Sequence, residues 1–406
     1  MSIVKKYNET SLVLRIVIGL VIGLVLALIV PQATWISLFG TIFVGALKAI
    51  APILVFVLVT SALASSNQKL GNQFVTIIVL YLCSTFLAAA VAVIGSTLFP
   101  VTLQQLATAA EEAAPQGIGE VFKTLLGNIV ANPVASLANA NYLGILFWSV
   151  VLGIALRKSS ETTKTALSNF SDAASTAVRW IINLAPFGIM GLVFDAVSTS
   201  GLAIFTDYGK LLLLLVGCMC VSALVINPIM AYICMRKNPY PLVFKCLKES
   251  GITAFFTRSS AANIPVNMNL CESLGLNKEI YSVSIPLGST INMAGAAVTI
   301  TVMTLAAAHT QGVHIYVPVA ILLSIMAALG ACGASGVAGG SLLLIPMACS
   351  LFGISNDIAM QVVGVGFIIG VIQDSVETAV NSSSDALFTS VAEFRQWRKE
   401  GKEIKF

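Results

Sequence analysis

Long apolar stretches separated by short polar ones run along most of this 406-residue chain. A helix that crosses a bilayer needs about 20 predominantly apolar residues, and most of these stretches approach or exceed that length. They are Leu12–Val30, Trp35–Ala64, Phe74–Phe99, Tyr142–Leu156, Val178–Val197, Leu211–Met235, Tyr281–Ala308, Val317–Phe352 and Ile358–Ile372. The pattern therefore predicts an all-α integral membrane protein that crosses the bilayer several times.

Two segments in the second half of the chain, Pro241–Ser273 and Val317–Phe352, are interrupted by small and polar residues. The interruptions are Thr257–Pro265, which contains Arg258, two serines and Asn263, and the glycine-rich Gly330–Ser341. Each segment predicts a helix, a polar tip and a second helix, which is the pattern of a re-entrant hairpin. Backbone outside a helix is tolerated at membrane depth only where it lines a cavity.

Each interrupted segment is followed by a span that carries a polar motif. Asn292-Met293-Ala294-Gly295-Ala296 follows the first, and an acidic motif, Asp374–Asp385, follows the second. This order suggests an internal repeat, and inverted repeats place one site near the midplane between the two tips. Simpler interpretations stay open for each feature alone. The serines and glycines are also compatible with close helix packing, and Asn292 with a plain kink.

The acidic motif places Asp374, Glu377/Thr378, Asn381 and Asp385 along one face of a helix, because they recur at steps of three and four residues. A charge at the bilayer centre costs at least about 2.5–3.5 kcal/mol, so such a stripe is expected to face a cavity and to have a function. No Lys or Arg lies between Lys278 and Arg395. We therefore expect the counter-charges to arrive from outside as cations or amines, which indicates a transport site.

Composition and charge placement agree with a membrane protein. Only 10% of the residues are charged and the mean hydropathy is +0.93, whereas soluble proteins have about 25% charged residues. If the spans alternate, most of the 22 Lys and Arg residues fall on one side, which predicts cytoplasmic N- and C-termini. No basic patch with interleaved aromatic residues is present, so nucleic-acid binding is a poor interpretation.

Two classes of intramembrane protease, serine and aspartyl, share single features with this sequence. Gly333-Ala-Ser335-Gly336 matches the motif of intramembrane serine proteases, but a serine nucleophile needs a base within hydrogen-bond reach. The two histidines, His309 and His314, precede this motif near the outer end of a span and are read as ordinary interfacial residues. Asp374 and Asp385 lie about three turns apart on one helix, too far for an aspartyl dyad. We therefore expect no enzymatic activity.

The motifs together resemble one family, the sodium-coupled dicarboxylate/amino-acid symporters of the glutamate-transporter superfamily. Thr257-Arg-Ser-Ser-Ala-Ala is similar to the first hairpin tip, Gly330–Ser341 to the second, Asn292–Ala296 to the family's N-M-D-G-T segment, and Asp374-x-x-x-Thr378-x-x-Asn381-x-x-x-Asp385 to the last span. Within the family, the chain is most similar to the bacterial members that carry serine and threonine. The likeness covers nearly the whole length.

The resemblance implies eight transmembrane helices plus two re-entrant helical hairpins, at about 241–273 and 317–352. Residues 1–70 and 128–206 would form a scaffold that trimerises, and residues 71–127 and 207–406 a transport domain that moves as an elevator. It further implies a homotrimer in the bacterial cytoplasmic (inner) membrane, in contact with lipid. Sodium would be the coupling ion, with no other cofactor.

The resemblance also implies roles for individual residues. Asp374 would bind the substrate amine, while Thr378, Asn381 and the hairpin-tip backbone would bind its carboxylate. The substrate-binding residues would be Ser259, Ser260, Met293, Val337, Asp374, Glu377, Thr378 and Asn381. One sodium would be bound by Gly288, Asn292, Asn381 and Asp385, and a second by Thr290, Met293, Ala331, Cys332 and Ala334. A third site of the family would correspond to Tyr81, Ser84, Thr85 and Asn292.

Two departures from the family pattern bear on substrate and stoichiometry. Members that carry acidic substrates have an arginine at the position of Glu377. A glutamate there would repel a substrate carboxylate, but it could accept a hydrogen bond from a substrate hydroxyl. We therefore expect neutral substrates, serine and threonine, with a basic amino acid as the runner-up. An acidic substrate, proton coupling and a passive channel are further alternatives. Ala294 replaces the motif's aspartate, so fewer coupled sodium ions are expected.

Overall fold

A computed structural model of the chain describes residues 10–64, 72–103, 127, 130–332 and 339–404, which are helical without any strand. The predicted all-α fold is thus confirmed. The first half contains α2 (Leu12–Ile29), η1 (Thr34–Ile36), α3 (Ser37–Ala64), α4 (Asn72–Leu98), α6 (Pro133–Ala138), α7 (Tyr142–Ala155), η2 (Leu156–Lys158), α8 (Glu161–Ile182) and α9 (Ala185–Ser200).

The second half is built from shorter helices that end in one long helix. Its elements are α10 (Ile204–Val221), η3 (Ser222–Ile226), α11 (Asn227–Met235), α12 (Tyr240–Cys246), η4 (Leu247–Gly251), α13 (Ile252–Thr257), α14 (Ile264–Ser273), α15 (Lys278–Ile291), α16 (Ala294–Thr310), α17 (Val317–Ala331), η5 (Gly340–Leu344), α18 (Ile345–Cys349), η6 (Ser350–Phe352) and α19 (Asn356–Lys399). Of these, η3 and η4 are single turns of π-helix.

Helices α2, α3, α7, α8 and α9 pack mainly on one another. Glycines permit the closest of these contacts. A Cβ on Gly19 or Gly23 of α2 would collide with the backbone of α9 at Pro186 or Met190, and Gly40 of α3 faces Gly191 of α9 in the same way. Small residues at helix contacts let backbones approach closely, as is usual between membrane helices. We call this set the first packing group.

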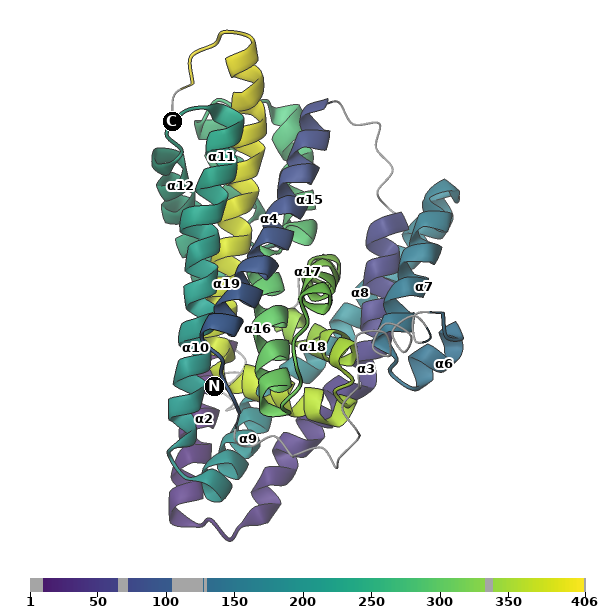
Figure 1. Cartoon of the computed structure of the whole chain (residues 1–406), viewed down its shortest axis with the longest axis vertical. Coiled ribbons are helices and arrows are strands. Elements are labelled where there is room, and N and C mark those ends of the chain that lie inside the picture. The colour runs from purple at the N-terminus through teal and green to yellow at the C-terminus, as the bar shows by residue number, and fades with distance from the viewer. Residues whose placement is uncertain (1–9, 65–71, 104–126, 128–129, 333–338, 405–406) are drawn as a thin grey trace, which may run out of the picture.

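A second packing group surrounds α16 and α19 and includes α4, α10, α11 and the elements from α12 to α18. Helix α19 runs along the centre of this group toward the C-terminus (Figure 1). Every residue of α16 from Ala294 to Ala308 is buried. Helix α16 is therefore enclosed on all sides by α4, α10, α17, α18 and α19.

Breaks in the helices fall mostly at the predicted interruptions. Helices α15 and α16 are separated by Asn292 and Met293, and α13 and α14 by the segment 258–263, where Arg258 takes a left-handed conformation (φ 51°). Helix α14 folds back on η4, which gives the expected helix–tip–helix hairpin. The apolar stretch Val178–Val197 is broken into two helices, α8 and α9, that meet at 53°. Pro186 lies in the first turn of α9 and has no N–H to donate to the carbonyl of Ile182, so one regular helix does not continue through it.

The described residues contain five helices that are long and apolar enough to cross a membrane. They are Thr34–Ser61, Gln73–Leu98, Ile204–Met235, Lys278–Thr310 and Asn356–Lys399, and α8 with α9 would add a sixth. The apolar helices Leu14–Ile29, Val317–Ala331 and Gly340–Phe352 are shorter. The chain is thus a multi-pass membrane protein, and the count of eight spans stays a prediction.

Candidate functional site

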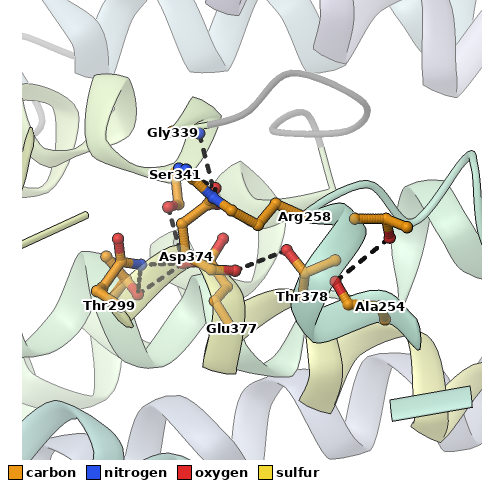
Figure 2. A network of polar contacts seen from close by, with 10 residues as sticks. Ala254, Arg258, Thr299, Gly339, Ser341, Asp374, Glu377 and Thr378 are labelled. Atoms are coloured by element: carbon orange, nitrogen blue, oxygen red, sulfur yellow. Dashed lines mark hydrogen bonds and ion pairs between the residues drawn. The ribbon is translucent and has the colours of Figure 1, made fainter. Parts of the chain in front are cut away.

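Helix α19 brings its polar residues to the point where both interrupted segments and the α15–α16 break meet. Ser355 caps its N-terminus by accepting a hydrogen bond from Ile358 N, and the helix then continues without a break to Lys399. Asp374, Glu377, Asn381 and Asp385 therefore share one face, as predicted, and all four are buried. The polar network around the first two is drawn in Figure 2.

Asp374 forms an ion pair with Arg258 from the first hairpin tip. Both Nε and Nη2 of Arg258 lie 2.7 Å from Oδ2 of Asp374, and both side chains are at most 10% exposed. Among the described residues, the other oxygen, Oδ1, receives only a long contact of 3.5 Å from Gly339 N. The expectation that the counter-charges arrive from outside the chain was therefore wrong for Asp374. No basic residue lies near it on α19, as predicted, but a cation comes from a segment 116 residues away in the sequence.

Glu377 is surrounded by neutral donors. Its Oε2 accepts hydrogen bonds from Thr299 (2.7 Å), Ser341 (2.9 Å) and Gln373 (2.6 Å). Gln373 also donates to Thr299 at 2.8 Å, which closes the network. Among the described residues, no donor contacts Oε1. The carboxylate is thus held in one orientation by α16, η5 and its own helix, with one oxygen left to accept a further hydrogen bond.

The remaining predicted substrate residues lie around these carboxylates with varied partners. Asn381 accepts a hydrogen bond from Gly295 N (2.7 Å) through Oδ1, which leaves its Nδ2 as a donor without an acceptor among the described residues. Thr378 donates to the carbonyl of Asp374 within α19. At the first hairpin tip, Ser259 caps Ala262 N and Ser260 is buried.

Met293, another predicted substrate residue, is buried in the α15–α16 break. Val337 lies outside the described residues.

Asp385 and Asn292 each hold one buried side-chain oxygen that no described residue contacts by a hydrogen bond. Asn292 Nδ2 donates to Asp385 Oδ1 (2.9 Å) and to Ser384 (2.7 Å). Asp385 Oδ2 and Asn292 Oδ1 are buried without a hydrogen-bond partner among the described residues. A buried polar atom without a partner is costly. Two oxygens of this kind at adjacent side chains are suited to a hard cation such as sodium. Gly288 lies directly against this carboxylate.

The second and third sodium sites stay predictions, and several of their residues make hydrogen bonds within the chain in this structure. Thr290 donates to Leu287 O, and Cys332 donates through Sγ to Ile291 O in the break. Ala331 is buried at the end of α17, and Ala334 lies outside the described residues. Ser84 donates to Asn227, and Thr85 to the carbonyl of Tyr81.

A pocket borders the Arg258–Asp374 pair on the side of the first packing group. Its lining there is apolar and includes Leu12, Ile16 and Ile189, while Gln373, Asp374 and Arg258 form the opposite wall. Among the described lining residues, the polar partners for a ligand at this point come from the second packing group, and the first group contributes apolar side chains.

Sequence reasoning missed four residues of this network: Arg258, Thr299, Ser341 and Gln373. Arg258 was visible as a charge inside an otherwise small-residue tip, so its burial cost was a usable signal. Gln373 precedes Asp374 and is four residues from Glu377, which also pointed to this face. Thr299 and Ser341 carried no signal, because single hydroxyl residues are common in membrane helices.

The comparisons with known proteins agree with the geometry. The model of the sodium:dicarboxylate symporter family matches residues 12–394. The chain belongs to this family. It is 63% identical over 399 residues to the serine/threonine transporter SstT of Bifidobacterium adolescentis, covering 98% of this chain and 93% of that protein.

Two further relatives carry the same name. The serine/threonine transporter SstT of Streptococcus thermophilus is 61% identical over 397 residues, covering 98% of this chain and 99% of that protein. The one of Streptococcus agalactiae is 61% identical over 390 residues, covering 96% of this chain and 97% of that protein. The resemblance found from the hairpin tips and the last span is thereby confirmed.

Proposed function

We propose that this family member is a sodium-coupled symporter that imports serine and threonine across the bacterial cytoplasmic membrane. The observation that carries the proposal is the environment of Glu377, a buried acceptor held by three neutral donors at the position where carriers of acidic substrates have an arginine. A carboxylate there repels an acidic side chain and accepts a hydrogen bond from a hydroxyl. The relatives named as serine/threonine transporters support the same substrate class.

The substrate is proposed to lie between the two hairpin tips with its three polar groups separated. Its ammonium binds Oδ1 of Asp374, because Arg258 occupies only Oδ2. Its carboxylate accepts from Asn381 Nδ2 and from backbone N–H groups of the tips, whose helix ends favour anions. Its hydroxyl donates to Oε1 of Glu377. Asp374 thus serves two cations at once, one from the chain and one from the substrate.

The coupling sodium is proposed to bind at Asp385 and Asn292, the pair with unpartnered oxygens. Backbone oxygens of Gly288 and Asn381 complete the ligand set by family resemblance. Sodium there would satisfy oxygens that otherwise stay buried without partners. It would also fix the backbone of Asn292 and Asn381, which flanks the substrate residues. Sodium binding and substrate binding would therefore favour each other.

The two packing groups support the proposed division into a scaffold and a transport domain. Helices α2, α3, α7, α8 and α9 fall in residues 1–70 and 128–206, and nearly all other elements in 71–127 and 207–406. We propose eight spans with two re-entrant hairpins, both termini in the cytoplasm, a homotrimer assembled through the scaffold, and an elevator motion of the transport domain.

A basic amino acid is the second candidate substrate, and one observation favours it. Asp374 has Arg258 as its counter-ion, whereas no cation contacts Glu377 among the described residues. The site therefore holds one uncompensated negative charge if both carboxylates are ionised. A lysine-like side chain would neutralise it, so lysine competition against labelled serine separates the two candidates.

Uptake of radiolabelled serine into proteoliposomes tests the proposal. With an inward sodium gradient we expect saturable uptake above equilibrium, inhibited by threonine and not by lysine or aspartate. Uptake that does not depend on sodium and does not saturate would identify a passive channel. If a proton gradient without sodium drove uptake equally well, the coupling ion would be the proton instead of sodium.

A further inference from the structure

Buried polar side chains continue along α19 beyond the proposed sodium site, toward its C-terminal end. Glu377, Asn381, Asp385, Thr389 and Glu393 recur every four residues, so they form a continuous stripe that winds by about 160° around the helix from its first member to its last. None is more than 6% exposed. At 1.5 Å per residue this polar ladder spans about 24 Å. The proposed substrate and sodium sites use its first three members and leave Thr389 and Glu393 without a role.

Each member of the polar ladder is matched by a polar group on the antiparallel α15–α16 segment. The partners, in the same order, are Thr299, the Gly295 N–H, Asn292, Ser284 and the Asn277 N–H. Their contacts are 2.7–2.9 Å long. The ladder is therefore a continuous polar seam between two helices inside an otherwise apolar packing group.

A cluster of hydroxyl groups fills the step between Asp385 and Thr389. Tyr81 enters from α4, and its Oη lies 3.0 Å from Thr389 Oγ1, 3.1 Å from Asp385 O and 3.3 Å from Ser284 O. Ser284 Oγ is 2.9 Å from Thr389 Oγ1. Tyr81, Ser284 and Thr389 are completely buried. The cluster offers oxygens only, as a hard cation requires, and more acceptors than its hydroxyl protons can occupy.

Gly288 leaves the Asp385 carboxylate and this cluster open to each other. The position that a Cβ on Gly288 would take is 2.7 Å from Asp385 Oδ1 and 2.8 Å from Tyr81 Oη. Any side chain there would separate the two groups. The second carboxylate oxygen, Asp385 Oδ2, is buried and lacks a partner among the described residues. The Asp385 carboxylate and the hydroxyl cluster are therefore neighbours, and position 288 places no side chain between them.

We propose that the polar ladder is the exit route of the coupling sodium, from Asp385 past Tyr81, Ser284 and Thr389 to Glu393 at the cytoplasmic end. This inference rests on the proposed sodium site at Asp385. The surroundings of the seam are apolar and include Ile285, Leu387 and Phe388, where a bare cation is strongly disfavoured. The hydroxyl cluster would bind the sodium transiently between Asp385 and the cytoplasmic end, and the negative charge of Glu393 would attract it toward that end.

The variant Thr389→Val tests the route, because it removes one hydroxyl and keeps the shape of the side chain. Ser390→Ala is the matched control: Ser390 is equally buried, but within the described part of the chain its hydroxyl donates only to Ala386 O of its own helix. Two rates are measured in proteoliposomes. One is net sodium-driven serine uptake into sodium-free vesicles, which requires sodium release in every cycle. The other is serine exchange with saturating sodium on both sides, which does not.

We expect Thr389→Val to slow net uptake at least about tenfold, equivalent to about 1.4 kcal/mol in the barrier, and to leave exchange near the wild-type rate. Ser390→Ala should change neither rate. Equal slowing of both rates by Thr389→Val would show that the cluster only holds the helices together. Unchanged net uptake would show that sodium leaves another way, for instance beside the substrate.

A second variant, Glu393→Gln, keeps the proposal falsifiable if Thr389→Val does not fold. An amide keeps an oxygen for the Asn277 N–H, which both carboxylate oxygens now contact at 2.9 and 3.0 Å, but it removes the charge. Net uptake should again fall while exchange persists, and a parallel change in both would reject the route. Wild-type uptake that does not depend on sodium would instead reject the proposed function itself.

Discussion

Asp374 is the residue whose replacement we expect to weaken substrate binding most, but its ion pair complicates the experiment. A charge-assisted hydrogen bond contributes about 1.5–3 kcal/mol, so Asp374→Asn should raise the Kd for serine by about 10- to 150-fold. The same change leaves the buried Arg258 charge without its partner. Breaking a buried ion pair in this way costs about 3–5 kcal/mol. A loss of binding in this variant alone therefore has two explanations.

A double-mutant cycle with Arg258→Met separates them. If Asp374 binds the ammonium, the double variant Arg258→Met/Asp374→Asn should bind serine as weakly as Asp374→Asn does. Arg258→Met alone should bind serine within a few-fold of wild type or more tightly, because the ammonium then becomes the only cation on Asp374. Equilibrium binding of labelled serine to purified protein at saturating sodium gives all four Kd values.

Recovery of serine binding in the double variant would refute the assignment of the substrate ammonium to Asp374. If the double variant binds serine nearly as well as wild type, the defect of Asp374→Asn came from the stranded guanidinium and not from a lost ammonium contact. Thermal unfolding of the same four proteins supplies the control. Asp374→Asn should unfold at a lower temperature than wild type, and the double variant should regain part of the difference.

Three further predictions concern selectivity and coupling. Asp385→Asn should raise the sodium concentration for half-maximal uptake, because the unpartnered anionic oxygen is lost; a change in substrate preference alone would contradict the sodium role. Glu377→Arg should let aspartate compete with labelled serine, since a guanidinium binds carboxylates with two parallel hydrogen bonds; a folded, transporting variant that aspartate does not inhibit would argue against charge control at this position. Because Ala294 is a buried neutral residue, reversal potentials should give one or two sodium ions per serine, and Ala294→Asp should raise that number; a wild-type ratio of three would contradict this.

The acidic stripe was predictable because helical spacing alone places its members on one face, and α19 is a single uninterrupted helix. The hairpin interruptions were predictable for a similar reason, since glycine, serine and proline disfavour a continuous apolar helix. Arg258 was not assigned to Asp374, because ion pairing between distant segments depends on tertiary packing. The same limit applies to Thr299 and Ser341, whose contacts with Glu377 join α16 and η5 to α19.

The bend between α8 and α9 was also missed, and its cause lies within the sequence. The apolar stretch continues through Asn183 and Leu184, so hydropathy alone describes one span. The local signal was Pro186, which has no N–H to continue the hydrogen bonds of the preceding helix and is favoured in the first turn of a new one. Hydropathy detects where residues prefer lipid, whereas the direction of a helix depends on backbone chemistry at a few positions.

The enclosure of α16 has a consequence for biosynthesis. A chain leaves the ribosome from its N-terminus, so α16 enters the bilayer before α17, α18 and α19, three of the helices that cover it, have been made. Until then, Thr299, Thr301 and Thr304, all buried in the finished protein, lie beside lipid or wait within the insertion machinery. A chain truncated before α19 would keep this surface exposed. Such a fragment would also leave the Thr299 hydroxyl without Glu377 and Gln373, its hydrogen-bond partners on α19.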